Sequence, residues 1–287
     1  MDETDDQRLA RHERIAGLAL PRLSVLADDL DALVTEVFHP RIPYEHLNGA
    51  DMMALTFVTK QREHLRSVQT LLATRAHRDA LLIARTMFEG MTILLWAFRG
   101  KPERTDLWFW YGAILDWRQL RKKEEAGIPV DPHDWAALKP HLDKHGPNYY
   151  QEKVRDRIRE AERNGTTYEL PDDPWRNKWN TADLASMLTE IGGRDAYDLI
   201  YRQVSEWIHW GARGILRAMQ PTDWGTAGFA EEDWRAAVLA LQIGCQSLLQ
   251  SLEVLDDHFS LRMAQDLATL EETRLVIVAE TTAAGSP

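Results

Sequence analysis

The chain has 287 residues, a formal net charge of −11 and a single cysteine, Cys245. The acidic balance argues against a protein that coats DNA non-specifically, because phosphate binding depends on Lys and Arg, and one cysteine excludes an internal disulfide. We find no run of about 18 uncharged apolar residues, and the first residues are acidic where a signal peptide would be basic. We therefore expect a cytoplasmic protein with no membrane partner.

Helical periodicity dominates the first 126 residues. Apolar residues follow one helical face from Arg22 to Phe38, and Pro21 is placed where a helix can start. Three further helices are predicted over residues 51–74, 77–98 and 102–126. Because the helix over 77–98 is apolar on more than one face, we expect it to be central.

Residues 127–178 have a different composition. The stretch 128–140 is rich in proline and predicts turns, 149–163 predicts a charged and solvent-facing helix, and 164–173 predicts an exposed loop. We interpret residues 127–178 as a surface insertion or cap within a single helical domain that spans residues 1–287.

Helical patterns return in the last third of the chain. Thr181 is predicted to cap a helix over 182–191, and longer helices follow over 194–219 and 231–258. A short, weaker helix is predicted over 261–280. No sustained apolar/polar alternation predicts a strand. The fold class is therefore predicted to be all-α, a bundle of about six to nine helices with a charged, Pro-rich insertion.

Two polar stripes lie on these apolar helices. One of them contains Arg202, Ser205, Glu206 and His209, which share a face of an ideal α-helix. The other contains Arg85 and Glu89, four residues apart on the helix over 77–98. Charges on so apolar a helix are costly to bury without partners, so we expect the two stripes to face each other.

The sequence around the stripes resembles a bacterial family, the domain of unknown function 5677. The resemblance is carried by the run Ala84–Glu89, Trp179, residues 184–192, Tyr197, Tyr201, Arg202, Ser205 and His209. It covers about residues 77–215 and implies a helical core in which the Arg/Glu helix pairs with the Tyr/Ser/His helix. It implies no particular activity.

A more distant similarity is to the HEPN superfamily, many of whose members are metal-independent ribonucleases of bacterial defence and toxin systems. Their motif is an arginine, a polar residue and then a histidine after a short spacer, and Arg202 and His209 fit with six residues between them. Active members usually carry Asn, Asp or His after the arginine, where this chain has Gln203.

This similarity implies that Arg202 binds a phosphate and that His209 transfers a proton at the ribose hydroxyl or the leaving oxygen. The supporting residues would be Arg85, Glu89, Tyr201, Ser205 and Glu206. It also implies RNA bound in a local cleft, no metal or other cofactor, and a homodimer that brings two motifs together.

Other interpretations stay open. Arg202 and Glu206 are four residues apart and form a pair that supports a helix, so the cluster is also compatible with a purely structural role. A non-catalytic protein that binds a ligand or a partner is a second alternative. A third is a helical di-iron carboxylate protein, because Glu206 and His209 have the Glu-x-x-His spacing that this class uses twice.

Overall fold

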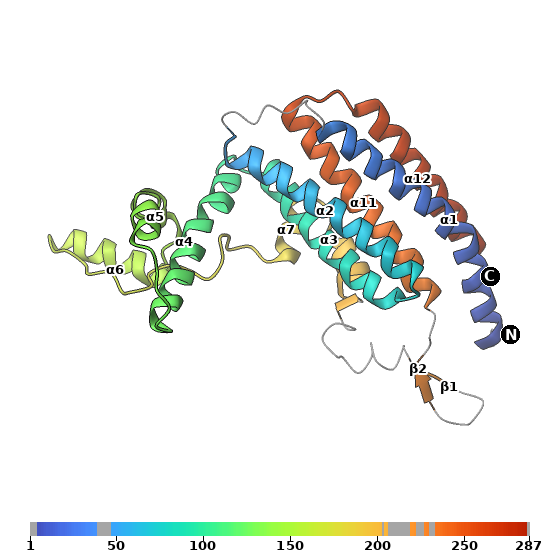
Figure 1. The fold of residues 1–287 in the computed structure, drawn as a ribbon, viewed down its shortest axis with the longest axis horizontal. Helices are drawn as coiled ribbons and strands as arrows, with labels where there is room; N and C mark the ends of the chain where they lie inside the picture. The colour runs from blue at the N-terminus through green and yellow to red at the C-terminus, as the bar shows by residue number, and fades with distance from the viewer. Residues whose placement is uncertain are drawn as a thin grey trace. The chain divides into compact units, whose positions relative to one another are not determined.

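A computed structural model of the chain describes residues 5–38, 47–202, 204–205, 219–221, 227–229 and 233–285. Most of these residues are helical, so the all-α prediction is confirmed. Within these ranges, β structure consists of the short antiparallel pair β1 (Met219–Pro221) and β2 (Ala227–Phe229) and an isolated bridge between Tyr150 and Trp175. The chain divides into two compact units (Figure 1).

The first unit comprises Met1–His46, Ala54–Arg99 and Asp183–Pro287. Its helices are α1 (Asp5–Phe38), most of α2 (Gly49–Ala73), α3 (His77–Arg99), α7 (Leu184–Glu190), α8 (Arg194–Ala196), the π-helical turn η2 (Tyr197–Tyr201), α11 (Trp234–Phe259) and α12 (Ala264–Gly285). The packing centres on α11, which lies against α1, α3 and α12. Fully buried apolar side chains fill this core, among them Leu23, Leu65, Met87, Leu94, Leu241 and Leu248.

The helices α3 and α11 form the apolar centre of this unit, as predicted for the helix over 77–98. Both are long and apolar enough, by length and composition, to cross a membrane, but half of the apolar window of α3 and 72% of that of α11 are buried inside the protein. Gly244 allows α11 to lie close to the Leu65 side chain of α2, because a Cβ at position 244 would lie 2.9 Å from Leu65 Cδ1. A core helix of a bundle has this character.

Two helix starts differ from the prediction. Helix α1 begins at Asp5 and contains Pro21 in its interior. The proline takes a backbone donor away from the carbonyl of Gly17, but both residues are exposed, so water can satisfy that carbonyl. Helix α7 is capped by Asp183 instead of Thr181, with the Asp183 carboxylate accepting a hydrogen bond from the Ser186 N–H at 2.7 Å.

The second unit comprises Leu47–Met53 and Gly100–Ala182. It contains α4 (Glu103–Glu125), α5 (Pro132–His145), the 3-10 turn η1 (Gly146–Tyr149) and α6 (Glu152–Arg163). Its small core is largely aromatic and consists of Tyr111, Ile114, Tyr149 and Trp175, with further tryptophans packed around it. As predicted, α6 is highly charged, and Val154 is its one buried residue.

Arg118 of α4 holds the segment that returns from α6. Its guanidinium donates to the Asp173 carboxylate at 2.8 and 3.1 Å, to the Tyr111 hydroxyl, and to the backbone carbonyls of Trp175 and Arg176. The hydrogen bond to Asp173 is the main reason why the pKa of Arg118 is raised. Together with the Tyr111 hydroxyl, which donates to the Arg176 carbonyl at 3.0 Å, Arg118 connects α4 to an otherwise irregular stretch of chain.

The prediction of turns over 128–140 is wrong for most of that stretch, because α5 occupies it from Pro132 onwards. Asp131 caps the helix by accepting from the His133 N–H at 2.9 Å, and Pro132 occupies a first-turn position where a missing N–H costs little. Pro140 lies inside the helix, and the carbonyl that it leaves without a donor belongs to the exposed Ala136.

Candidate functional site

The two predicted polar stripes meet in the first unit. The Arg85 guanidinium of α3 donates through Nη2 to the Tyr201 hydroxyl at 2.5 Å and through Nε to Ser205 Oγ at 3.1 Å. It also pairs with the Glu89 carboxylate at 2.8 Å and lies 4.4 Å from the centre of the Tyr201 ring. The structure thus brings together four of the predicted site residues, which we call the Arg85 cluster: Arg85, Glu89, Tyr201 and Ser205.

The Arg85 cluster is internally satisfied. The Arg85 side chain is only 14% exposed, and the Glu89 carboxylate neutralises its charge. Burial, followed by the hydrogen bond to Glu89, raises the pKa of Tyr201, which therefore stays a neutral phenol. Ser205 Oγ donates to the Tyr201 carbonyl at 2.7 Å. This arrangement anchors the segment around Tyr201 and leaves no free charge of its own for a ligand.

The anchored segment contains a π-helical turn. In η2 the Arg202 N–H donates to the Tyr197 carbonyl, five residues back, whereas the prediction assumed ordinary α-helical geometry. After this turn, Ser205 belongs to the Arg85 cluster, whereas Arg202 is 68% exposed and pairs with Asp198 at 3.3 Å. The predicted single stripe is therefore divided between Ser205, which contacts α3, and Arg202, which faces solvent. Glu206 and His209 lie outside the described residues, as does Gln203.

Arg202 belongs to an exposed row of charges along η2. Asp198 lies between Arg194 and Arg202, four residues from each, and pairs with Arg194 at 3.5 Å and with Arg202 at 3.3 Å. Within the described part of the chain, two guanidinium groups therefore share one carboxylate, and these three side chains together carry one positive charge in excess. We call these residues the Arg194–Arg202 row. Sequence reasoning missed Arg194 and Asp198, although their four-residue spacing was a usable signal.

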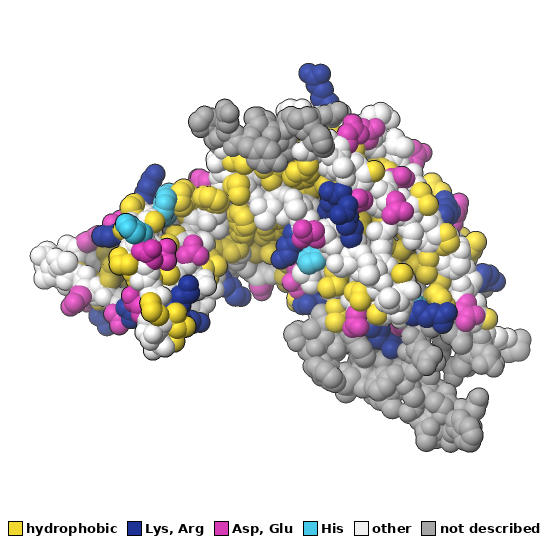
Figure 2. All heavy atoms as spheres, in the orientation of Figure 1, with side chains coloured by type: hydrophobic (Ala, Val, Ile, Leu, Met, Phe, Trp, Pro, Cys, Tyr) yellow, Lys and Arg dark blue, Asp and Glu magenta, His cyan; other side chains and the backbone are white. Residues whose placement is uncertain are grey.

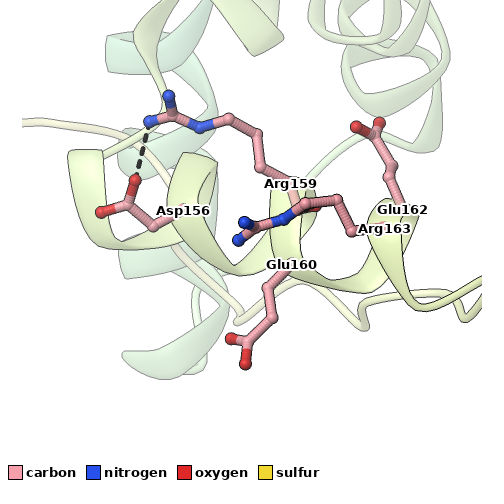
Figure 3. Close-up of a pocket in the computed structure, with 5 residues that line it drawn as sticks. All are labelled: Asp156, Arg159, Glu160, Glu162 and Arg163. Atoms are coloured by element: carbon pink, nitrogen blue, oxygen red, sulfur yellow. Dashed lines mark hydrogen bonds and ion pairs between the residues drawn. The ribbon is translucent and has the colours of Figure 1, made fainter.

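The hollow on the Asp156–Arg163 face of α6 gives no competing candidate. A hollow of about 710 Å³ on α6 is lined by Asp156, Arg159, Glu160, Glu162 and Arg163. Figure 3 shows that these side chains point in different directions, and Arg159 pairs with Asp156 at 2.7 Å. Ligand pockets are mostly apolar with a few convergent polar groups, so this hollow has the character of a solvated helix face.

The part of the chain that the structure describes adds no support to the di-iron alternative. There, no group of three or more His, Cys, Asp and Glu side chains could hold a metal ion. The Glu-x-x-His spacing occurs a second time in the sequence, at Glu36 and His39. Glu36 is exposed on α1, whereas His39, like Glu206 and His209, falls outside the described ranges.

A model of the Family of unknown function (DUF5677) matches residues 51–226, which is more than half of the chain. The chain belongs to this family. Comparison with curated proteins and comparison with solved structures gave no match.

The family match extends beyond the residues that carried the resemblance, 77–215, on both sides. It contains α3, the Arg85 cluster and the Arg194–Arg202 row, together with the second unit from Gly100 to Ala182. The helices α1, α11 and α12 lie outside it, and of these α11 packs against α3. Both candidate features therefore belong to the family region, and the family description carries no activity.

Proposed function

We propose that the protein is a metal-independent ribonuclease of the HEPN type, with a role in bacterial defence or as a toxin. The observation that carries the proposal is the Arg194–Arg202 row, in which, among the described residues, the exposed Arg202 guanidinium pairs with a carboxylate that is itself exposed and shared with Arg194. An exposed pair of this kind is worth about 0–1 kcal/mol, so an RNA phosphate can displace Asp198 at little cost.

Arg202 supplies the charge that the reaction needs. Its planar fork can donate two parallel hydrogen bonds to phosphate oxygens, and these bonds strengthen as negative charge builds up on them. Arg194 adds a second cation on the same side of the turn. On the face of the molecule that Figure 2 draws, acidic and basic side chains are interspersed and form no extended basic surface among the described residues.

The chemistry is an internal transfer at phosphorus. The ribose 2′ oxygen attacks the adjacent phosphorus while the bond from phosphorus to the 5′ oxygen breaks. The proton of the 2′ hydroxyl is taken up by a general base, and a proton is delivered to the leaving 5′ oxygen. By the resemblance, His209 performs these transfers, which typically contribute about 10²–10⁴-fold to the rate. The products are a 2′,3′-cyclic phosphate and a 5′ hydroxyl.

The Arg85 cluster has a positioning role in this proposal. Its hydrogen bonds hold Tyr201 and Ser205 against Arg85 of α3, and these two residues lie on either side of Arg202 in the sequence. In the resemblance two copies of the motif act together, and we propose that this chain acts as a homodimer. Small errors in the placement of a charged group lower rates strongly, which gives such an anchor a catalytic value.

The test is RNA cleavage by the purified chain in EDTA, with analysis of the product ends. Wild-type protein should cleave and leave 2′,3′-cyclic phosphates, and Arg202→Ala and His209→Ala should each lose about 100-fold or more. Arg157→Ala is the matched control, because Arg157 is similarly exposed and also has one carboxylate partner. An inactive wild-type protein, or unchanged rates in both site variants, would refute the proposal.

A further inference from the structure

The second unit contains an arginine, Arg176, that has no carboxylate within 4.0 Å among the described residues. Arg176 is partly buried, and its guanidinium donates to the Trp179 carbonyl at 2.7 Å and lies 5.5 Å from the centre of the Tyr149 ring. Its Nε is buried and has no hydrogen-bond acceptor. Burial, followed by the charge of Arg155, lowers the pKa of Arg176. Arg118, which has Asp173 as a partner, shows the opposite shift.

Arg155 of α6 lies near Arg176, at the neighbouring residues Asn148 and Tyr149. Its Nη2 donates to the Asn148 carbonyl at 2.7 Å, and the Arg176 backbone N–H donates to the carbonyl of the next residue, Tyr149, at 2.9 Å. Within the part of the chain that the structure describes, neither Arg155 nor Arg176 has a carboxylate within 4.0 Å. Their neighbours on α6 do: Arg157 pairs with Glu160, and Arg159 with Asp156.

Two neighbouring cations without a counter-charge are an unfavourable arrangement unless an anion offsets them. One of the pair is also partly desolvated, which strengthens its attraction to an anion. Two guanidinium groups match the charge of a phosphate monoester better than that of a single carboxylate, and their forks suit its tetrahedral oxygens.

We propose that Arg155 and Arg176 bind the phosphate group of a ligand. This site is separate from the Arg194–Arg202 row and does not depend on the proposed ribonuclease activity. Arg155 lines an open hollow of about 500 Å³, whose lining also includes the apolar residues Tyr150 and Ile158, and the partly exposed Arg176 lies outside that lining. The hollow also contains Arg159 and two glutamates, one of which, Glu152, is paired with Arg159 at 3.2 Å.

The experiment is isothermal titration of the full chain with inorganic phosphate and with adenosine 5′-monophosphate, supported by melting curves. A ligand that binds only the folded state raises the melting temperature, and sodium chloride at equal ionic strength measures the general salt effect. We expect phosphate to bind and to raise the melting temperature above the chloride control. Tighter binding of the nucleotide would identify a phosphate with an organic moiety, and equal binding would identify the free anion.

Three variants localise the binding. Arg155→Gln and Arg176→Gln should each weaken phosphate binding by about tenfold or more, the usual effect of removing a charged hydrogen-bond donor. Arg155→Gln decides the question if Arg176→Gln does not fold. Arg157→Gln, on the same helix but paired with Glu160, should bind as the wild type does. No phosphate binding beyond the chloride effect, or an equal loss in Arg157→Gln, would overturn the proposal.

Discussion

Replacement of Arg85 by methionine tests the anchor on which the site depends. The change keeps most of the side-chain volume and removes the guanidinium that contacts Glu89, Tyr201 and Ser205. The polar groups that lose Arg85 as a partner keep some of their hydrogen bonds. Ser205 Oγ still donates to the Tyr201 carbonyl, and the Glu89 side chain, 32% exposed, can be hydrated.

The expected cost follows from these contacts. A hydrogen bond to a charged group contributes about 1.5–3 kcal/mol, and the contacts of one guanidinium are lost together, so they do not add in full. We expect Arg85→Met to destabilise the segment by about 2–3 kcal/mol. Arg202→Gln, which breaks an exposed pair on the same turn, should cost less than about 1 kcal/mol.

Hydrogen exchange is the suitable assay, because two compact units can unfold separately and a single global transition is then not well defined. Amides of residues 194–205 should exchange roughly 30- to 160-fold faster in Arg85→Met, the factor that corresponds to about 2–3 kcal/mol. Tyr201→Phe combined with Arg85→Met should be less harmful than the sum of the two changes. Exchange no faster than in Arg202→Gln would refute the anchoring role.

Three further predictions concern stability and reactivity. Arg118→Gln should destabilise the second unit by about 2–4 kcal/mol, because it removes the donors to the Asp173 carboxylate and to the backbone carbonyls of Trp175 and Arg176. Arg121→Gln on the same helix breaks only an exposed pair and should cost less than about 1 kcal/mol. Hydrogen exchange at amides of the second unit measures both changes. Hydrogen bonds from Arg62 and Arg66 of α2 lower the pKa of Asp31 to about 2. The Asp31 carboxylate therefore contributes to the free energy of unfolding above the unfolded-state pKa near 3.8, and this contribution is lost as the pH falls through about 2. Asp31→Asn should flatten the acid side of a plot of urea stability against pH. Cys245 is fully buried and its pKa is raised to about 12, so a thiol reagent should label it only in denaturant, and labelling of native protein at pH 8 would show that the core opens.

Much of the helical order could be predicted from the sequence, because the apolar spacing of α2, α3 and α11 directly reports the face that each helix buries. The errors have local causes. Proline was read as a boundary at Pro21 and Pro140, but a proline is tolerated inside a helix when the carbonyl that it frees is exposed. Sequence patterns report burial, and at exposed positions they do not report which conformation the backbone takes.

The site was only partly accessible to such reasoning. The pairing of Arg85 with Tyr201 and Ser205 follows from the cost of placing charges on an apolar helix. The exposure of Arg202 could not be predicted in the same way, because a helical stripe does not indicate which of its members faces the neighbouring helix and which faces solvent. The unpaired Arg176 was equally hidden, since its neighbours come from α6 and η1 through the tertiary fold.

The most direct test of the central claim compares the two partners of one ion pair. The measurement is the single-turnover rate of RNA cleavage in EDTA for Asp198→Asn and Arg202→Gln beside the wild type. If Arg202 binds the scissile phosphate and Asp198 only occupies it in the absence of RNA, Asp198→Asn should cleave at least as fast as the wild type. Arg202→Gln should lose about 100-fold, as expected when a group that stabilises developing charge is removed. Equal losses in the two variants, or no cleavage by the wild-type protein, would contradict the account.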